Sequence, residues 1–127
     1  MREYEVVFIL KGNTEGPAAD KIQEKVREIV KKEKEELLGI QFLGKKALAY
    51  PIEKEVRGNY YLVNIVGQGK VVNELERYFR LHEDVIRFLT VKIRDDVELE
   101  KRKEEYATVL KSKIEEKGET HESHIES

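Results

Sequence analysis

The chain has 127 residues, a length that suits one domain of ordinary size. It contains no cysteine, which excludes a disulfide framework and a cysteine-based metal site. No apolar run approaches the roughly 20 residues of a membrane-spanning helix, and the strand-like start shows no secretory signal, so we expect a cytoplasmic protein.

The net charge of −2 conceals an uneven distribution along the chain. Residues 1–94 carry 18 Lys and Arg against 15 Asp and Glu, a balance of +3, whereas residues 95–127 carry 6 against 11, a balance of −5. Binding to nucleic acid depends on local basic surface rather than on total charge. The overall composition therefore neither supports nor excludes an RNA partner.

Strand and helix patterns alternate through residues 1–94. In chain order, the periodicity predicts a strand over Glu3–Leu10, a helix from Pro17 with apolar positions from Ala19 to Val30, and a strand from Leu38 toward Tyr50. It then predicts a strand over Tyr60–Val66, a helix with Val72, Leu75 and Phe79 on its apolar side, and a strand over Val85–Ile93. Pro51 is expected to end regular pairing of the second strand, because it has no amide hydrogen. This order predicts an α+β, ferredoxin-like split β-α-β fold, in which two helices cover one face of a four-stranded antiparallel sheet and the first and third strands are central.

The sheet face opposite the helices is predicted to be partly apolar. Glu5 and Asn64 indicate which side of the central strands faces outward, and placing Phe88 inward turns Arg87 outward. The outward apolar residues are then Val7, Ile9, Leu62, Leu89 and Val91, with Tyr60 on the same side. Such a patch is typical of a partner site. Two alternatives stay open: both faces are apolar because the central strands are buried, or a C-terminal helix covers them.

Residues 95–127 divide into two further segments. Residues 95–117 form a charged extension. Within it, Val97–Lys117 could be helical, with one side formed by Leu99, Tyr106, Leu110 and Ile114. A solvated, partly formed helix is the favoured expectation. Residues 118–127 are acidic and poor in apolar residues, and we expect them to be disordered. The spacing of His121 and His124 is taken as incidental rather than as a metal site.

Catalytic chemistry has little support in the sequence. His82 stands beside Glu83 and Asp84, but such neighbours are common on protein surfaces. No serine lies within residues 1–94. The Gly67-Gln68-Gly69 turn before a helix could hold a phosphate, although helix capping is the more ordinary use. We therefore expect no enzyme, no metal and no cofactor.

The basic residues fall into two groups. Those of the first helix alternate with glutamates and suit a solvated helix face. The others lack regular compensation, and Arg2 and Lys92 should converge if the first and fourth strands pair. Tyr4, Tyr50 and Tyr60 could stack on exposed bases, or they could belong to the core.

Three segments carry a family resemblance: REYEVVFIL, LGKKALAYPIEK and LERYFRLHEDVIRFLTVKI. Together they resemble the bacterial small-subunit ribosomal protein S6 family over residues 1–94. The resemblance implies a ferredoxin-like fold and binding to 16S ribosomal RNA in the platform region as a pair with ribosomal protein eighteen (S18). The RNA-binding residues implied are Arg2, Lys45, Lys46, Lys54, Arg80, Arg87 and Lys92. Docking of ribosomal protein S18 would explain the outward cluster of Val7, Ile9, Tyr60, Leu62, Leu89 and Val91.

The chain departs from the family pattern at the second strand. Leu43 stands where an aromatic residue often precedes the glycine, and Lys45 and Lys46 stand where arginine is frequent. Lysine neutralises phosphate but lacks the planar fork, so contact with the RNA backbone is the safer expectation. We predict a protein that is monomeric when free. The alternative is a ferredoxin-like regulatory module that self-associates through its sheet and binds a small ligand.

Overall fold

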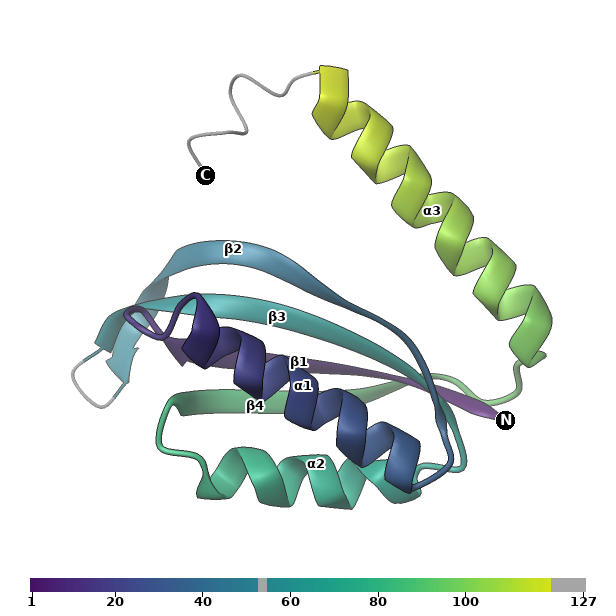
Figure 1. Ribbon diagram of the computed structural model, residues 1–127, viewed down its shortest axis with the longest axis horizontal. Coiled ribbons are helices and arrows are strands. Elements are labelled where there is room, and N and C mark those ends of the chain that lie inside the picture. The colour runs from purple at the N-terminus through teal and green to yellow at the C-terminus, as the bar shows by residue number, and fades with distance from the viewer. Residues whose placement is uncertain (53–54, 120–127) are drawn as a thin grey trace.

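The computed structural model describes residues 1–52 and 55–119, with side chains described for residues 1–48 and 55–109. Its elements are β1 (Arg2–Lys11), α1 (Pro17–Lys32), β2 (Glu36–Ile52), β3 (Glu55–Gly67), α2 (Lys70–Leu81), β4 (Val85–Arg94) and α3 (Leu99–Glu119). The strands form one antiparallel sheet in the order β2-β3-β1-β4. Figure 1 shows α1 and α2 side by side on one face of the sheet, and α3 beyond the other. The predicted ferredoxin-like fold with β1 and β3 central is confirmed.

The core lies between the sheet and α1 and α2. Phe8 is completely buried, and its ring stacks on Tyr61 at 5.1 Å and on Phe79 at 4.7 Å between centroids. Val26 of α1 is also completely buried. The inward residues of the central strands are those that the alternation predicted: Val6, Phe8, Leu10, Tyr61, Val63 and Ile65. Alternation along the strands is therefore sufficient to identify the core face of this sheet.

Two details of the sequence prediction are wrong. Val71, rather than Val72, is the buried residue in the first turn of α2, where it joins Leu75 and Phe79. β2 continues through Pro51 to Ile52, although its regular pairing with β3 breaks after Ala47 and is resumed at Ile52. Regular pairing is therefore lost before Pro51, and the wrong detail is the end of the strand, which lies at Ile52 rather than near Tyr50.

The C-terminal extension forms a regular helix that is attached to the sheet near its start, while most of its described residues are exposed. α3 begins at Leu99 and continues to Glu119, beyond the predicted end at Lys117. Its first two turns contact β1 and β2 through Arg102, Lys103 and Tyr106. The predicted disordered tail lies, from residue 120 onward, outside the described residues, and so do His121 and His124. None of the helices in the described ranges is long and apolar enough to cross a membrane.

Candidate RNA and protein interface

The sheet face opposite α1 and α2, here called the outer face, carries the predicted partner residues in neighbouring rows. Val7 of β1 lies between Leu62 of β3 and Leu89 of β4 in the strand register. One row away, Glu5 pairs with Asn64 on one side and with Val91 on the other. In the opposite direction, the row consists of Tyr60, Ile9 and Arg87. The fold therefore brings together all six residues of the predicted partner cluster.

Exposure within this cluster increases toward β4. Leu89 is 62% exposed and Val91 is 45% exposed, whereas Val7, Leu62 and Tyr60 are half-buried. Ile9 is only 7% exposed, so the expectation of an uncovered Ile9 is wrong. Its side chain packs so closely against Gly58 that a Cβ atom at Gly58 would overlap it. The accessible apolar surface is thus centred on Leu89 and Val91, at the edge strand of the sheet.

A buried glutamate at the start of β1 attaches α3 to the outer face, at the end of the sheet away from Tyr60 and Arg87. Glu3 is completely buried and accepts hydrogen bonds from Arg102 of α3, from Arg94 of β4 at 3.1 Å and from the Asn64 side chain at 3.2 Å. The hydrogen bond to Glu3 raises the pKa of the Arg102 guanidinium above its ordinary value. Sequence reasoning missed this cluster, because an outward-facing glutamate at the start of a strand normally indicates solvent.

Tyr106 provides the second attachment of α3, on β2. Its hydroxyl accepts a hydrogen bond from the Gln41 amide at 2.9 Å. Its ring lies against Gly39, where a Cβ atom would be 2.6 Å from the hydroxyl oxygen and 2.9 Å from a ring carbon. The absence of a side chain at Gly39 is therefore what allows this close approach. One alternative in the sequence was that a C-terminal helix covers the outer face. α3 is attached over the β1–β2 part of that face only.

The predicted RNA-binding cations separate into groups at opposite ends of the sheet. Arg2 and Lys92 both lie near Asp95, and the hydrogen bond from Lys92, at 2.6 Å, is the main reason that the pKa of Asp95 is below its usual value. At the far end, Lys46 lies over the Tyr60 ring, 5.4 Å from its centroid, in the same part of the outer face as Arg87. These cations therefore form two separate basic regions rather than one continuous surface.

Two further predicted cations, Lys45 and Arg80, flank the second region. Lys45 projects from β2 and pairs with Glu15 at 3.0 Å. Arg80, near the end of α2, lies over the Phe88 ring at 5.7 Å from its centroid. Lys54 is outside the described residues. Lys45, Lys46 and Arg87 are exposed, so phosphate groups can approach them without rearrangement of the core.

Features that could suggest catalysis have structural roles here. His82 ends α2, and its Nδ1 accepts a hydrogen bond from the Asp84 amide at 3.0 Å. The amides of Gly69 and Lys70 at the start of α2 donate to the Glu35 carboxylate at 3.2 and 2.9 Å. A carboxylate of the chain itself thus occupies the position that a phosphate would take, which confirms capping as the use of this turn.

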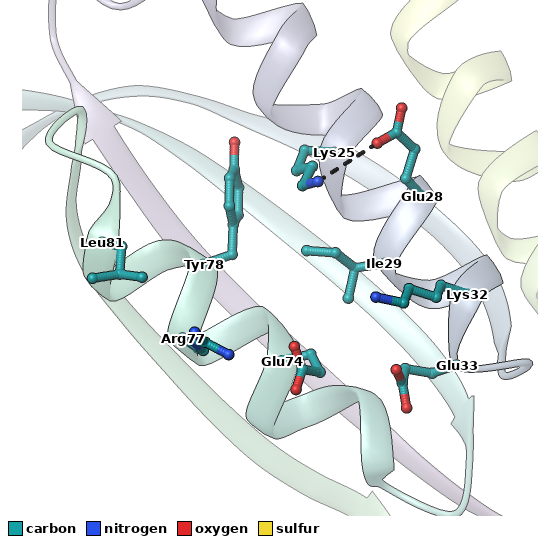
Figure 2. Close-up of a pocket in the computed structure, with 9 residues that line it drawn as sticks. All are labelled: Lys25, Glu28, Ile29, Lys32, Glu33, Glu74, Arg77, Tyr78 and Leu81. Atoms are coloured by element: carbon teal, nitrogen blue, oxygen red, sulfur yellow. Dashed lines mark ion pairs between the residues drawn. The ribbon is translucent and has the colours of Figure 1, made fainter.

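An open groove of about 470 Å³ lies between α1 and α2, on the helix side of the molecule (Figure 2). Its charged lining is balanced, with the cations Lys25, Lys32 and Arg77 facing the carboxylates Glu28, Glu33 and Glu74. Burial, and then the charges of Asp84 and Glu28, raise the pKa of Tyr78 in this groove. Within residues 1–52 and 55–119, no group of three potential ligands is placed to hold a metal ion. The groove therefore shows neither the enclosure nor the convergent polar groups typical of a small-molecule site.

Comparisons with known proteins agree with this architecture. The family model described as Ribosomal protein S6 matches residues 3–92. The small ribosomal subunit protein bS6 of Nitratiruptor is 40% identical over 92 residues, which are 72% of this chain and 72% of the relative. The protein of the same name from Syntrophobacter fumaroxidans is 37% identical over 112 residues, which are 88% of this chain and 76% of the relative. The crystal structure of 30S ribosomal protein S6 from Thermotoga maritima superposes with a TM-score of 0.67 at 25% identity, covering 84% of this chain and 96% of that one.

The matched region includes α1, α2, β2, β3 and all but the outer ends of β1 and β4, and so contains the apolar cluster and, of the cations placed in the two basic regions, all but Arg2. The resemblance inferred from three sequence segments is thereby confirmed, and the non-enzymatic assignment follows from the family. This chain belongs to the ribosomal protein S6 family, the bS6 proteins of the small ribosomal subunit.

Proposed function

We propose that this protein binds 16S ribosomal RNA together with ribosomal protein S18 and supports assembly of the platform of the small subunit. The observation that carries the proposal is the composition of the outer face. Exposed Leu89 and Val91 lie on the same face as the cations Lys46 and Arg87. A protein partner can bury the apolar residues while RNA phosphates approach the cations beside them.

The exposed lysines suit contact with the RNA backbone. Lys46 is held over Tyr60 without a carboxylate partner among the described residues, and Lys45 has only an exposed pair with Glu15. An exposed ion pair contributes little free energy, so exchanging Glu15 for a phosphate costs little. Lys92 and Arg2 form a second point of backbone contact at the other end of the sheet. Two separated basic regions would hold the protein in one orientation on a folded RNA.

The alternative, a regulatory module that self-associates through its sheet and binds a small ligand, is less well supported. α3 is attached across the β1–β2 part of the outer face, at Glu3 and Gln41, and so reduces the surface open to a second copy. The groove between α1 and α2 is open and has a balanced charge (Figure 2). We accordingly propose a monomer when free, located in the cytoplasm and on ribosomes.

Reconstitution with purified components tests the proposal. The tagged protein should cosediment with 30S particles that lack their own bS6, and should bind a platform fragment of 16S RNA more tightly when ribosomal protein S18 is present. The matched control is a variant in which Lys21, Lys25 and Lys32 of α1 are replaced by alanine, because these exposed lysines belong to the helix layer on the side of the sheet opposite Lys46, Arg87, Leu89 and Val91. Self-association of the purified protein, with no gain in RNA affinity from S18, would favour the regulatory module.

A further inference from the structure

The attachment of α3 to the sheet is confined to its first two turns. Arg102 bonds Glu3, Lys103 approaches Glu36 at 3.6 Å, and Tyr106 bonds Gln41 at 2.9 Å. Val109, about one turn beyond Tyr106 and two turns beyond Arg102, is already 52% exposed. Figure 1 shows the helix rising away from the sheet toward its C-terminal end. An element held by a few polar side chains opens at a lower free energy than one buried in an apolar core.

The surface beneath α3 adjoins the apolar cluster and is itself polar. Gly39 and Asn64 are paired in the register, one row away from Gln41 and Leu62, which are themselves in line with Leu89. A stable protein interface buries about 800 Å² on each partner and involves about 20–30 residues a side. The six residues of the partner cluster fall far short of that number. An interface of that size that includes Leu89 and Val91 and continues across the sheet reaches Gln41 and Asn64, where α3 is attached.

The exposed side of α3 is a poor continuation of an apolar interface. The groove between the helix and the end of β4 is lined almost entirely by charged residues: Arg94, Asp96, Glu98, Lys101, Arg102 and Glu105, with Val97. Charged residues are depleted in the centre of protein interfaces. By contrast, removal of α3 would uncover Glu3 still bonded to Arg94 and Asn64, with capacity to accept one further guanidinium group.

We propose that α3 is a displaceable strap, and that Arg102 occupies in the free protein the position that an arginine of ribosomal protein S18 takes in the complex. This inference rests on the proposed function, because it assumes that S18 docks on the outer face. The strap shields the Glu3 carboxylate until the partner supplies a replacement cation. Free protein is then mostly closed, and its apparent affinity for S18 is reduced by the fraction of molecules in which α3 is open.

Two substitutions in the full chain open the strap by different routes. Arg102→Met removes the guanidinium that bonds Glu3, and Gly39→Ala places a methyl group where the Tyr106 ring now lies, without leaving a buried charge unpaired. Lys101→Met is the matched control on the same helix, because Lys101 is exposed and has no hydrogen bond or ion pair to the sheet among the described residues. The Gly39→Ala variant keeps the test decisive if Arg102→Met fails to fold.

Hydrogen exchange of the free proteins is the first measurement. Amides of residues 100–109 should exchange at least about tenfold faster in Arg102→Met and in Gly39→Ala than in the wild type, and at the wild-type rate in Lys101→Met. Unchanged exchange in both opening variants would overturn the strap, since α3 would then be held by something other than these contacts.

Titration with ribosomal protein S18 is the second measurement. Both opening variants should bind S18 at least about fivefold more tightly than the wild type and Lys101→Met. Equal or weaker binding by the opened variants would overturn the proposal and make α3 part of the docking surface or irrelevant to it. Absence of S18 binding by all four proteins would overturn the proposed function, whereas the exchange rates would still decide whether α3 opens.

Discussion

Replacing Leu89 with alanine separates the role of the outer face in binding from any role in folding. Leu89 is 62% exposed on the edge strand, so truncation should change the free energy of unfolding by no more than about 0.5 kcal/mol. Complete burial of a leucine side chain is worth about 1.5–3 kcal/mol. Burial of the 62% that is still exposed is therefore worth about 1–2 kcal/mol, which corresponds to a roughly 5–30-fold weaker complex with ribosomal protein S18.

Isothermal titration of S18 into wild-type and variant protein measures this change directly. Leu81→Ala is the matched control, because Leu81 is 75% exposed on the helix side of the molecule, far from the outer face. Circular dichroism and thermal unfolding should show the same fold and nearly the same Tm for all three proteins. Wild-type affinity in Leu89→Ala, or an equal loss in Leu81→Ala, would refute the assignment of the docking surface to the outer face.

Three further predictions concern the core, the RNA contacts and the pH dependence. Phe8→Ala should lower the free energy of unfolding by about 3–5 kcal/mol in urea titrations, because the ring is fully buried between two aromatic neighbours, whereas Val56→Ala, at 64% exposure, should cost less than about 0.5 kcal/mol. Joint replacement of Lys45, Lys46, Lys54 and Lys92 by alanine should weaken RNA binding and reduce the log–log salt slope by roughly 1 for each phosphate that is no longer neutralised; an unchanged slope would remove these lysines from the site. Burial, assisted by the charges of Asp20 and Glu15, raises the pKa of Tyr61 above its unfolded value near 10.0. The contribution of Tyr61 to stability is therefore complete below pH 10 and is lost as the pH rises through the folded pKa. Chemical denaturation between pH 9 and 11 should show this decline in the free energy of unfolding, and Tyr61→Phe should diminish it.

The fold is predictable because local and long-range preferences agree along most of the chain. Val6 and Phe8 alternate with Glu5 and Val7, so a period of two separates the core face of β1 from its outer face. Between the strands, the spacing of apolar residues changes to the helical period. The resulting order of strands and helices leaves few possible topologies. A local pattern does not determine which side of a short helix faces the sheet when two adjacent residues are equally apolar. Val71 and Val72 both fit a stripe with Leu75, and contact with the sheet decides between them.

The candidate site is predictable in part for a related reason. Alternation places Leu62, Leu89 and Val91 on the outer face without knowledge of the tertiary structure. The Glu3–Arg102 contact joins residues 99 positions apart, and neither residue has a neighbour in sequence that indicates the other. Individual RNA contacts stay predictions, because an exposed lysine or arginine can bind any phosphate that comes close to it, and its sequence position does not identify that phosphate.

The capping of α2 by Glu35 has a consequence for the order of events during folding. Glu35 belongs to the connection between α1 and β2, and it lies 34–36 residues before the amides that it binds. The first turn of α2 therefore lacks its cap until the preceding half of the domain is in place. β1 also pairs with partners that are far away in sequence, from Gly58 to Arg94, so the domain has a high contact order. Neither βαβ half is complete alone, and we expect the domain to fold in one cooperative step at a moderate rate.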